Sequence, residues 1–387
     1  MTKRLGFLLK NTLGIALALS VGGVPLLAHD GSVLNKLKTI STLSSTVPAN
    51  GDVNPYGLVR VPNTVGNLHE GHYLISNFNN SGNAQGTGTT IVDVSPGGAL
   101  TLFAQINPLT LPGPCPGGVG LTTALAVLRT GWVIVGSLPT TDGTSATAQA
   151  GCLIVLDSYG NPVETIYGSL INGPWDMTSI DTDHGAVLFV TNVLNGTQAA
   201  KGDVVNQGTV VRVNLAASEK YMPTLLSLTV IGTGFPERTD PAALVIGPTG
   251  VALSPSCRYD GDQDCWNSYG ESEPVLYVAD SLNNRIAVID HPFTRWFPAV
   301  GGKTLTSGGS LNDPLGLTVA TDGHVIAVNG DDGYATEITP QGTQIAKRLL
   351  DNTGTPPGNG ALFGVLFDPE NGLIFVDDAT NTLNKLQ

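Results

Sequence analysis

One block of sequence recurs six times along this chain of 387 residues, and this repetition constrains the fold more than any other feature. Each copy starts with a turn containing glycine or proline that runs into a short apolar strand. A second apolar strand follows and ends in a small residue or in Asn or Asp. A third strand and usually a fourth come next. The blocks start near Asn54, Gly117, Gly173, Gly247, Asp313 and Ala361.

Six blocks of about four strands predict an all-β fold, a six-bladed β-propeller. A β-sandwich would show turn signals about every 8–12 residues without this larger period. A parallel α/β fold would need helices between the strands, and no stretch after the N-terminal region has the 3.6-residue apolar period of a helix. The composition agrees, because 49 Gly, 25 Pro and only 13% charged residues are typical of an all-β chain with many tight turns.

The sixth block ends at Gln387, inside what would be its third strand. Residues 34–45 precede the first block and can supply the missing strand, and a disordered N-terminal tail is the alternative. We expect this N-terminal segment to complete the last blade, because closure removes an exposed sheet edge. Residues 34–387 are then a single propeller domain.

The N-terminus has the features of a secretory signal peptide over residues 1–28. Lys3 and Arg4 precede an apolar stretch that runs from Leu13 to Ala28. An uncleaved anchor helix is the alternative, but glycines and a proline interrupt the stretch. We therefore expect a secreted or periplasmic protein that has no membrane contact after cleavage.

The chain has four cysteines, and an even number in an exported protein indicates disulfides. Cys115 and Cys152 would lie on one face of the second blade, so we expect them to pair. Cys257 and Cys265 share one loop and would form the second pair.

The string PVLYVADSLNNRIAVID, from Pro274 to Asp290, resembles an NHL repeat, and the fifth and sixth blocks resemble relaxed versions of it. The resemblance implies an NHL-like propeller over nearly the whole mature chain. NHL-type propellers include interaction scaffolds, lactonases, lyases and nucleic-acid binders, so the resemblance does not specify an activity.

The second strands of the blades end on one face of the predicted propeller, near its axis. A ring of amide and carboxylate side chains there would hold a cation or a polar ligand, or each side chain would cap its own turn. Long polar loops over residues 77–88, 137–151 and 192–208 lie on the same face. The candidate ligand-face residues are Asn77, Asn192, Asp280, Asn329 and Asp377, with Ser137 at the equivalent place in the second blade.

Asp176 is the one candidate for a catalytic residue. It replaces the inner-strand glycine of the third blade and lies beside Trp175, so it could act as a general base or a metal ligand, or cap a turn. The histidines fall at separate turns and predict no zinc site. The resemblance to calcium-dependent gluconolactonase-like propellers implies a Glu with Asn and Asp near the axis, and no Glu starts an inner strand here.

The insertion from Asp260 to Glu271 has the spacing of a calcium-binding loop. Carboxylates and a hydroxyl occupy alternate positions of an EF-hand-like segment, and hard cations prefer such oxygen ligands. The alternative is an acidic, solvated loop that the second disulfide holds. The candidate calcium ligands are Asp260, Asp262, Asp264, Ser268 and Glu271.

These features favour an exported, monomeric, non-enzymatic scaffold that binds a protein or a small polar ligand on the face with the long loops. A formal net charge of −13 opposes nucleic-acid binding. The alternative is a calcium-dependent hydrolase or lyase that uses Asp176, Asp280 and Asp377 around the axis. Convergence of these oxygens at coordination distance would favour the enzyme.

Overall fold

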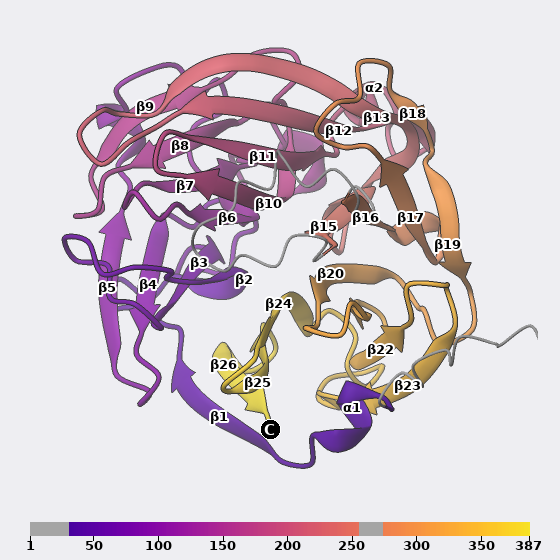
Figure 1. Cartoon of the computed structure of the whole chain (residues 1–387). Helices are drawn as coiled ribbons and strands as arrows, with labels where there is room; N and C mark the ends of the chain where they lie inside the picture. The colour runs from indigo at the N-terminus through magenta and orange to yellow at the C-terminus, as the bar shows by residue number, and fades with distance from the viewer. Residues whose placement is uncertain (1–30, 255–273) are drawn as a thin grey trace, which may run out of the picture. The chain divides into compact units, whose positions relative to one another are not determined.

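A computed structural model describes residues 31–254 and 274–387, in which Ser32–Gln387 form one compact unit. The unit consists of six antiparallel sheets, one for each repeated block (Figure 1). The first strands of the six blades pack against one another in cyclic order, so they surround a central axis. The predicted all-β, six-bladed propeller is confirmed.

The blades place their strands in four rings. The inner strands are β2 (Val53–Arg60), β6 (Leu121–Val127), β10 (Pro174–Thr182), β15 (Pro248–Leu253), β20 (Pro314–Val319) and β24 (Leu362–Asp368). The second strands are β3 (Tyr73–Asn79), β7 (Val133–Ser137), β11 (Gly185–Asn192), β16 (Val275–Asp280), β21 (Val325–Asn329) and β25 (Gly372–Asp377). The third strands are β4 (Thr90–Val94), β8 (Cys152–Leu156), β12 (Val205–Ala216), β17 (Arg285–Asp290), β22 (Tyr334–Ile338) and β26 (Thr382–Leu386).

The outer strands are β5 (Leu100–Gln105), β9 (Pro162–Ile166), β13 (Thr224–Asp240), β19 (Lys303–Ser307), β23 (Gln344–Leu349) and β1 (Ile40–Ser45). Short helical segments occur in the connections: α1 (Val33–Lys36), α2 (Thr197–Ala200), η1 (Pro108–Thr110), η2 (Ser145–Thr147) and η3 (Ser281–Asn283). No helix among residues 31–254 and 274–387 is long and apolar enough to cross a membrane.

The N-terminal strand β1 completes the last blade. It pairs antiparallel with β26, with Ile40 opposite Leu386 and Ser45 opposite Thr382. The expected closure of the ring is therefore confirmed. The beginning of the predicted segment is helical instead, because α1 buries Leu34 completely among the side chains of the fifth and sixth blades.

The inner strands approach one another closely where their glycines lie. A Cβ at Gly316 would overlap the backbone oxygen of Phe363, and a Cβ at Gly364 would overlap that of Tyr56. Only glycine permits such close backbone contact. The inner strands therefore pack tightly against one another at this level, and both glycines line a cavity of about 340 Å³.

The third blade differs from the others at its outer edge. Its strand β13 spans 17 residues and continues into a hairpin with β14 (Leu244–Ile246), and β18 (Ala299–Val300) pairs with it in parallel. Elsewhere, Cys115 and Cys152 are joined by a disulfide, as expected for the second blade. Cys257 and Cys265 lie outside the described residues.

Candidate functional site

An axial cavity of about 400 Å³ lies where the inner strands begin and the second strands end. Every blade contributes to its wall, and so does the hairpin from Arg238 to Ile246. The size is that of a pocket for a small molecule. The cavity is the candidate active site.

Four aromatic side chains, which we call the aromatic cluster, form part of the wall: Tyr56, Phe78, Trp175 and Phe363. The ring of Tyr56 stacks between Phe78 at 4.5 Å and Phe363 at 3.9 Å, measured between ring centroids. Trp175 lies 6.4 Å from Phe363. Each of the four is largely buried. The cluster offers aromatic surface to an apolar ligand.

Four carboxylates share the wall with these rings: Asp240, Asp313, Asp331 and Asp378. Among the described residues that line the cavity, Arg238 is the single Lys or Arg, and it forms an ion pair of 2.8 Å with Asp240. None of the other three carboxylates forms an ion pair within residues 31–254 and 274–387. The wall therefore has more acidic groups than cationic side chains.

Two of the carboxyl groups have pKa values near neutral pH. Burial, together with the charges of Asp331 and Asp240, raises the pKa of Asp313 to about 7. Burial, together with the charge of Asp377, raises the pKa of Asp378 to about 8. A carboxyl group whose pKa lies near the working pH can both accept and donate a proton.

The closure of the ring positions Asp378. With its side-chain amide oriented to satisfy its neighbours, Asn54 donates to the Asp378 carboxylate and accepts from Asn79 Nδ2 at 2.9 Å. Asn54 has a left-handed backbone with φ of 67°, a conformation that Asn tolerates better than most residues. The charge of Asp378 also adds to burial in raising the pKa of Tyr56.

The long loops of the first three blades touch one another on this face. Thr140 Oγ1 donates to the backbone oxygen of Gln85 at 2.5 Å, and Gln198 Nε2 donates to that of Ser145 at 2.7 Å. Gln85 Nε2 donates to the backbone oxygen of Ala242, at the tip of the hairpin, at 2.7 Å. The loops and the hairpin thus form one connected rim beside the cavity.

The predicted ligand-face residues are buried where the second strands end, but none of them lines the cavity. Each side chain bonds to a neighbouring loop, strand or turn. The bonds join Asn77 to Thr46, Ser137 to Gly118, Asn192 to Asn172, Asp280 to Arg285, Asn329 to Ser310, and Asp377 to Thr380.

The cavity is lined instead by the residue that follows each of these positions in five of the six blades. Successive residues of a strand point to opposite faces, so a shift of one position exchanges the buried side for the axial side. The lining residues are Phe78, Leu138, Ser281, Gly330 and Asp378.

Asp176 lies on the axis, but in a different cavity. It lines the space of about 340 Å³ beside Gly316 and Gly364, and Thr123 lines both cavities. Asp176 Oδ2 accepts a hydrogen bond of 2.9 Å from the backbone N–H of Val251 in the next blade. Burial raises the pKa of Asp176 to about 8.

The calcium ligands expected around the axis are not brought together. Asp176 bonds to Val251, Asp280 to Arg285 at 2.9 Å and Asp377 to Thr380 at 3.1 Å. Each residue therefore makes its own local contact through at least one oxygen, and the three do not form a cluster among the described residues. The expected calcium loop of Asp260, Asp262, Asp264, Ser268 and Glu271 lies outside the described residues.

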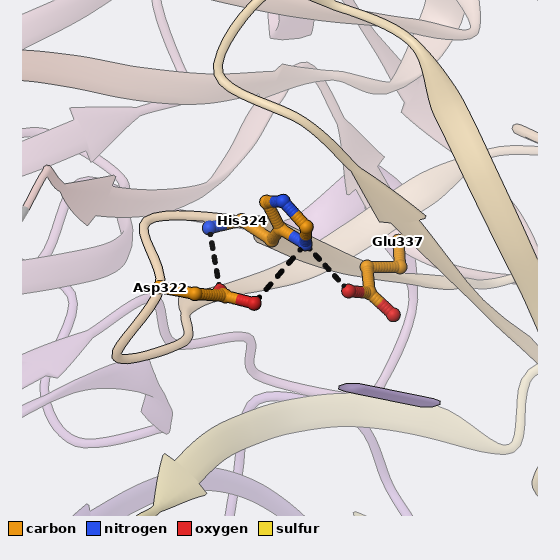
Figure 2. A group of neighbouring side chains, drawn as sticks. All are labelled: Asp322, His324 and Glu337. Carbon is orange, nitrogen blue, oxygen red and sulfur yellow. Dashed lines mark hydrogen bonds and ion pairs between the residues drawn. The ribbon is translucent and has the colours of Figure 1, made fainter. Parts of the chain in front are cut away.

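One possible metal site does occur among the described residues, away from the axial cavity: Asp322, His324 and Glu337 (Figure 2). His324 Nδ1 lies 2.7 Å from Glu337 Oε1 and 3.3 Å from Asp322 Oδ2. Glu337 also accepts hydrogen bonds from Ser32 Oγ and from the backbone N–H groups of Val33 and Leu34. The carboxylate thus holds the start of the N-terminal segment.

The sequence pattern did not predict the aromatic cluster or the carboxylates near Asp313. The repeat marks Asp313 and Phe363 only as turn and strand residues of their blocks. The hairpin that carries Arg238 and Asp240 belongs to no repeat. Asp378 follows Asp377 in an Asp-Asp pair, and the end of the second strand pointed to Asp377 as the ligand-face residue.

No protein-family model matches this sequence, and no curated protein does. Solved structures do match in fold. A gluconolactonase of Xanthomonas campestris has a TM-score of 0.53 at 12% identity, with 90% of this chain and 89% of that chain covered. A calcium-binding protein, regucalcin, of Agrobacterium tumefaciens has a TM-score of 0.53 at 14% identity, with 90% and 93% covered.

A virginiamycin B lyase of Staphylococcus aureus has a TM-score of 0.50 at 13% identity, with 90% of this chain and 99% of that chain covered. The chain therefore has the fold of the gluconolactonase-like six-bladed propellers. These matches overturn the expected non-enzymatic scaffold, because proteins that share the fold over nearly their whole length are named as a gluconolactonase and a lyase.

Proposed function

We propose that this protein is a hydrolase or lyase that acts on a small molecule in the axial cavity, with Asp313 and Asp378 as its proton-transfer groups. The observation that carries the proposal is the pair of partly buried carboxyl groups, with pKa values of about 7 and 8, in the wall of one cavity. Perturbed carboxyl groups in a cavity are typical of active sites.

The two carboxyl groups suit either reaction. In a hydrolysis, one carboxylate takes a proton from water as the water oxygen attacks an acyl carbon. The other group, still protonated, gives its proton to the leaving oxygen as the acyl–oxygen bond breaks. In an elimination, the carboxylate takes the proton from carbon, and the acid protonates the leaving group. Each route needs one group ionised and the other protonated.

Asp313 has the lower pKa and suits the role of base, and Asp378 suits the role of acid. The aromatic cluster would hold the apolar part of the substrate and exclude water from the reacting bond. Asn54, by contacting Asp378, would be a positioning residue.

Export of the enzyme and calcium binding by residues 260–271 are part of the same proposal. The basic and apolar N-terminal stretch supports export, and the oxygen spacing of the loop supports calcium. Calcium there would order a loop and would not take part in proton transfer. The NHL-like repeat supports the propeller architecture and no particular substrate.

The test is a screen of purified protein against lactones, esters and cyclic depsipeptides, followed by Asp313→Asn and Asp378→Asn. We expect each substitution to lower kcat by about 100-fold or more. Asp183→Asn, in an exposed turn outside the cavity, is the matched control and should leave kcat unchanged. Full activity in both cavity variants would refute the proposal.

A further inference from the structure

The chemistry of the cavity wall also identifies the class of ligand. We propose that the axial cavity takes a small protonated primary amine that carries an aromatic or apolar body. The inference rests on the proposed function, in which this amine would be part of the substrate.

The first argument is charge. Of the four carboxylates in the wall, only Asp240 has a cationic partner among the described residues, and that partner is Arg238. Asp313, Asp331 and Asp378 are left to share one cavity of about 400 Å³. Asp313 and Asp378 are partly buried and Asp331 is exposed, and an ionised carboxylate that loses its contact with water when a ligand binds needs a compensating positive charge. A bound cation would supply it, and an anionic ligand would be repelled.

The second argument is hydrogen-bonding capacity. Gln85 Oε1 and Thr123 Oγ1 have no hydrogen-bond partner among the described residues; both residues belong to the cavity wall, Thr123 where it meets the second cavity, and both oxygens are covered in the empty cavity. Thr123 is only 5% exposed. An unpartnered buried oxygen is costly unless a ligand donates to it. Carboxylates and an amide oxygen accept hydrogen bonds, so a ligand with several donors would suit this wall. A primary ammonium has three N–H groups.

The third argument is the aromatic cluster. Tyr56 is stacked between Phe78 and Phe363, so both faces of its ring are covered, and an apolar body would contact the small part of these rings that remains exposed in the cavity wall. A carbohydrate would find aromatic surface here too, but it would need donors as well as acceptors in the wall. The wall has more carboxyl groups than cationic side chains, and this difference favours the amine.

Protons and the amine would compete for the same carboxylates. Burial favours protonated Asp313 and Asp378 in the empty cavity near neutral pH. A bound cation favours their ionised forms, so binding should release protons and tighten as the pH rises from 6 to 8.

The experiment is calorimetric titration of the wild-type protein with 2-phenylethylamine and with 2-phenylethanol, which differ mainly in the charged group. We expect the amine to bind at least about tenfold more tightly, a difference of about 1.4 kcal/mol. Titration in two buffers of different ionisation enthalpy should reveal proton release. Phenylacetate and glucose serve as the anionic and carbohydrate probes.

The variants identify the site. Asp313→Asn with Asp378→Asn should remove the preference for the amine, and Asp183→Asn should keep it. Equal binding of the amine and the alcohol by the wild type, tighter binding of glucose or phenylacetate, or no binding of the amine up to about 10 mM would each overturn the inference.

The outcomes separate this inference from the proposed function. Amine binding without turnover of any amine-bearing ester, lactone or eliminable substrate would refute the enzyme and leave the binding inference standing. Asp313-dependent turnover of neutral lactones by a protein that does not bind the amine would refute the binding inference and support the enzyme.

Discussion

The backbone N–H of Asn54 donates a hydrogen bond of 2.8 Å to the side-chain oxygen of Asn381. This bond joins the inner strand of the first blade to the β25–β26 turn of the last. The backbone oxygen of Asn381 accepts from Thr46, just after β1, at 3.0 Å. One turn therefore links both sides of the closure, and the same turn region carries Asp378. The contacts that close the ring therefore also place Asp378 in the cavity wall.

Deleting residues 34–45 should destabilise the whole propeller. The deletion removes β1, exposes the edge of β26 and empties the site of the fully buried Leu34. We expect a large fall in melting temperature or aggregation, measured by circular dichroism and light scattering.

The milder variant Glu337→Gln keeps β1 but weakens the bonds to Ser32, Val33 and Leu34. We expect a smaller fall in melting temperature, because one charged acceptor is replaced by a neutral one. Unchanged melting and solubility in the deletion variant would contradict the role assigned to β1.

Stability should fall with rising pH through Asp378. Its folded pKa is about 8, well above the value of about 3.9 for an unfolded Asp, so the folded state binds the proton more tightly. The unfolded state then loses this proton at lower pH, and stability decreases between about pH 4 and pH 8.

Asp378→Asn removes this contribution. We expect the variant to lose less melting temperature than the wild type between pH 5 and pH 8.5, and to melt several degrees higher than it at pH 8.5. Parallel melting curves of the two proteins across this range would contradict the assignment.

Activity should follow a bell-shaped pH profile. The base must be ionised and the acid protonated, so kcat/KM should rise through the pKa of about 7 and fall through that of about 8, as macroscopic values of the pair. Asp378→Asn should remove the alkaline limb along with most of the activity. An alkaline limb that persists in this variant would assign the acid to another group.

Loss of the Cys115–Cys152 disulfide should lower stability without changing the fold. The two cysteines are 37 residues apart, and a bridge of this span contributes about 3–4 kcal/mol by constraining the unfolded chain. We expect the Cys115→Ser, Cys152→Ser variant to melt several degrees lower. Its far-ultraviolet spectrum should match that of the wild type, and a wild-type protein whose melting is insensitive to reductant would argue against the bridge in solution.

Calcium should bind the loop of Asp260, Asp262, Asp264, Ser268 and Glu271. Titration of chelator-treated protein should show dissociation in the millimolar range or tighter. Asp262→Ala with Asp264→Ala should abolish it, and Asp183→Asn should not. Absence of heat and of any calcium-dependent melting shift would retire this prediction.

The architecture was predictable because the repeat extends over the whole propeller and marks the start of every blade. Six copies of one block, with a sixth that lacks its outer strand, leave little choice but closure by residues 34–45. The site was less predictable, because one strand position separates Asp377 from Asp378. The first bonds to Thr380 and the second faces the cavity, and nothing in an Asp-Asp pair tells which is which.

The hairpin that carries Arg238 and Asp240 shows a second limit. It continues a strand of 17 residues beyond the blade, and no repeat marks where it turns. The tilt that brings such an extension over the axis depends on packing between blades, which composition and periodicity do not describe.

The pairing of β1 with β26 also determines when the last blade can fold. Thr42 Oγ1 and Asn384 Oδ1 are bonded at 2.8 Å although 342 residues separate them in the chain. The last blade therefore cannot be completed until β26 has been synthesised, and β1 has no partner strand before then. Contacts of such long range make folding slow. Removing β26 should then be as damaging as removing β1, because the two strands pair with each other in the same blade.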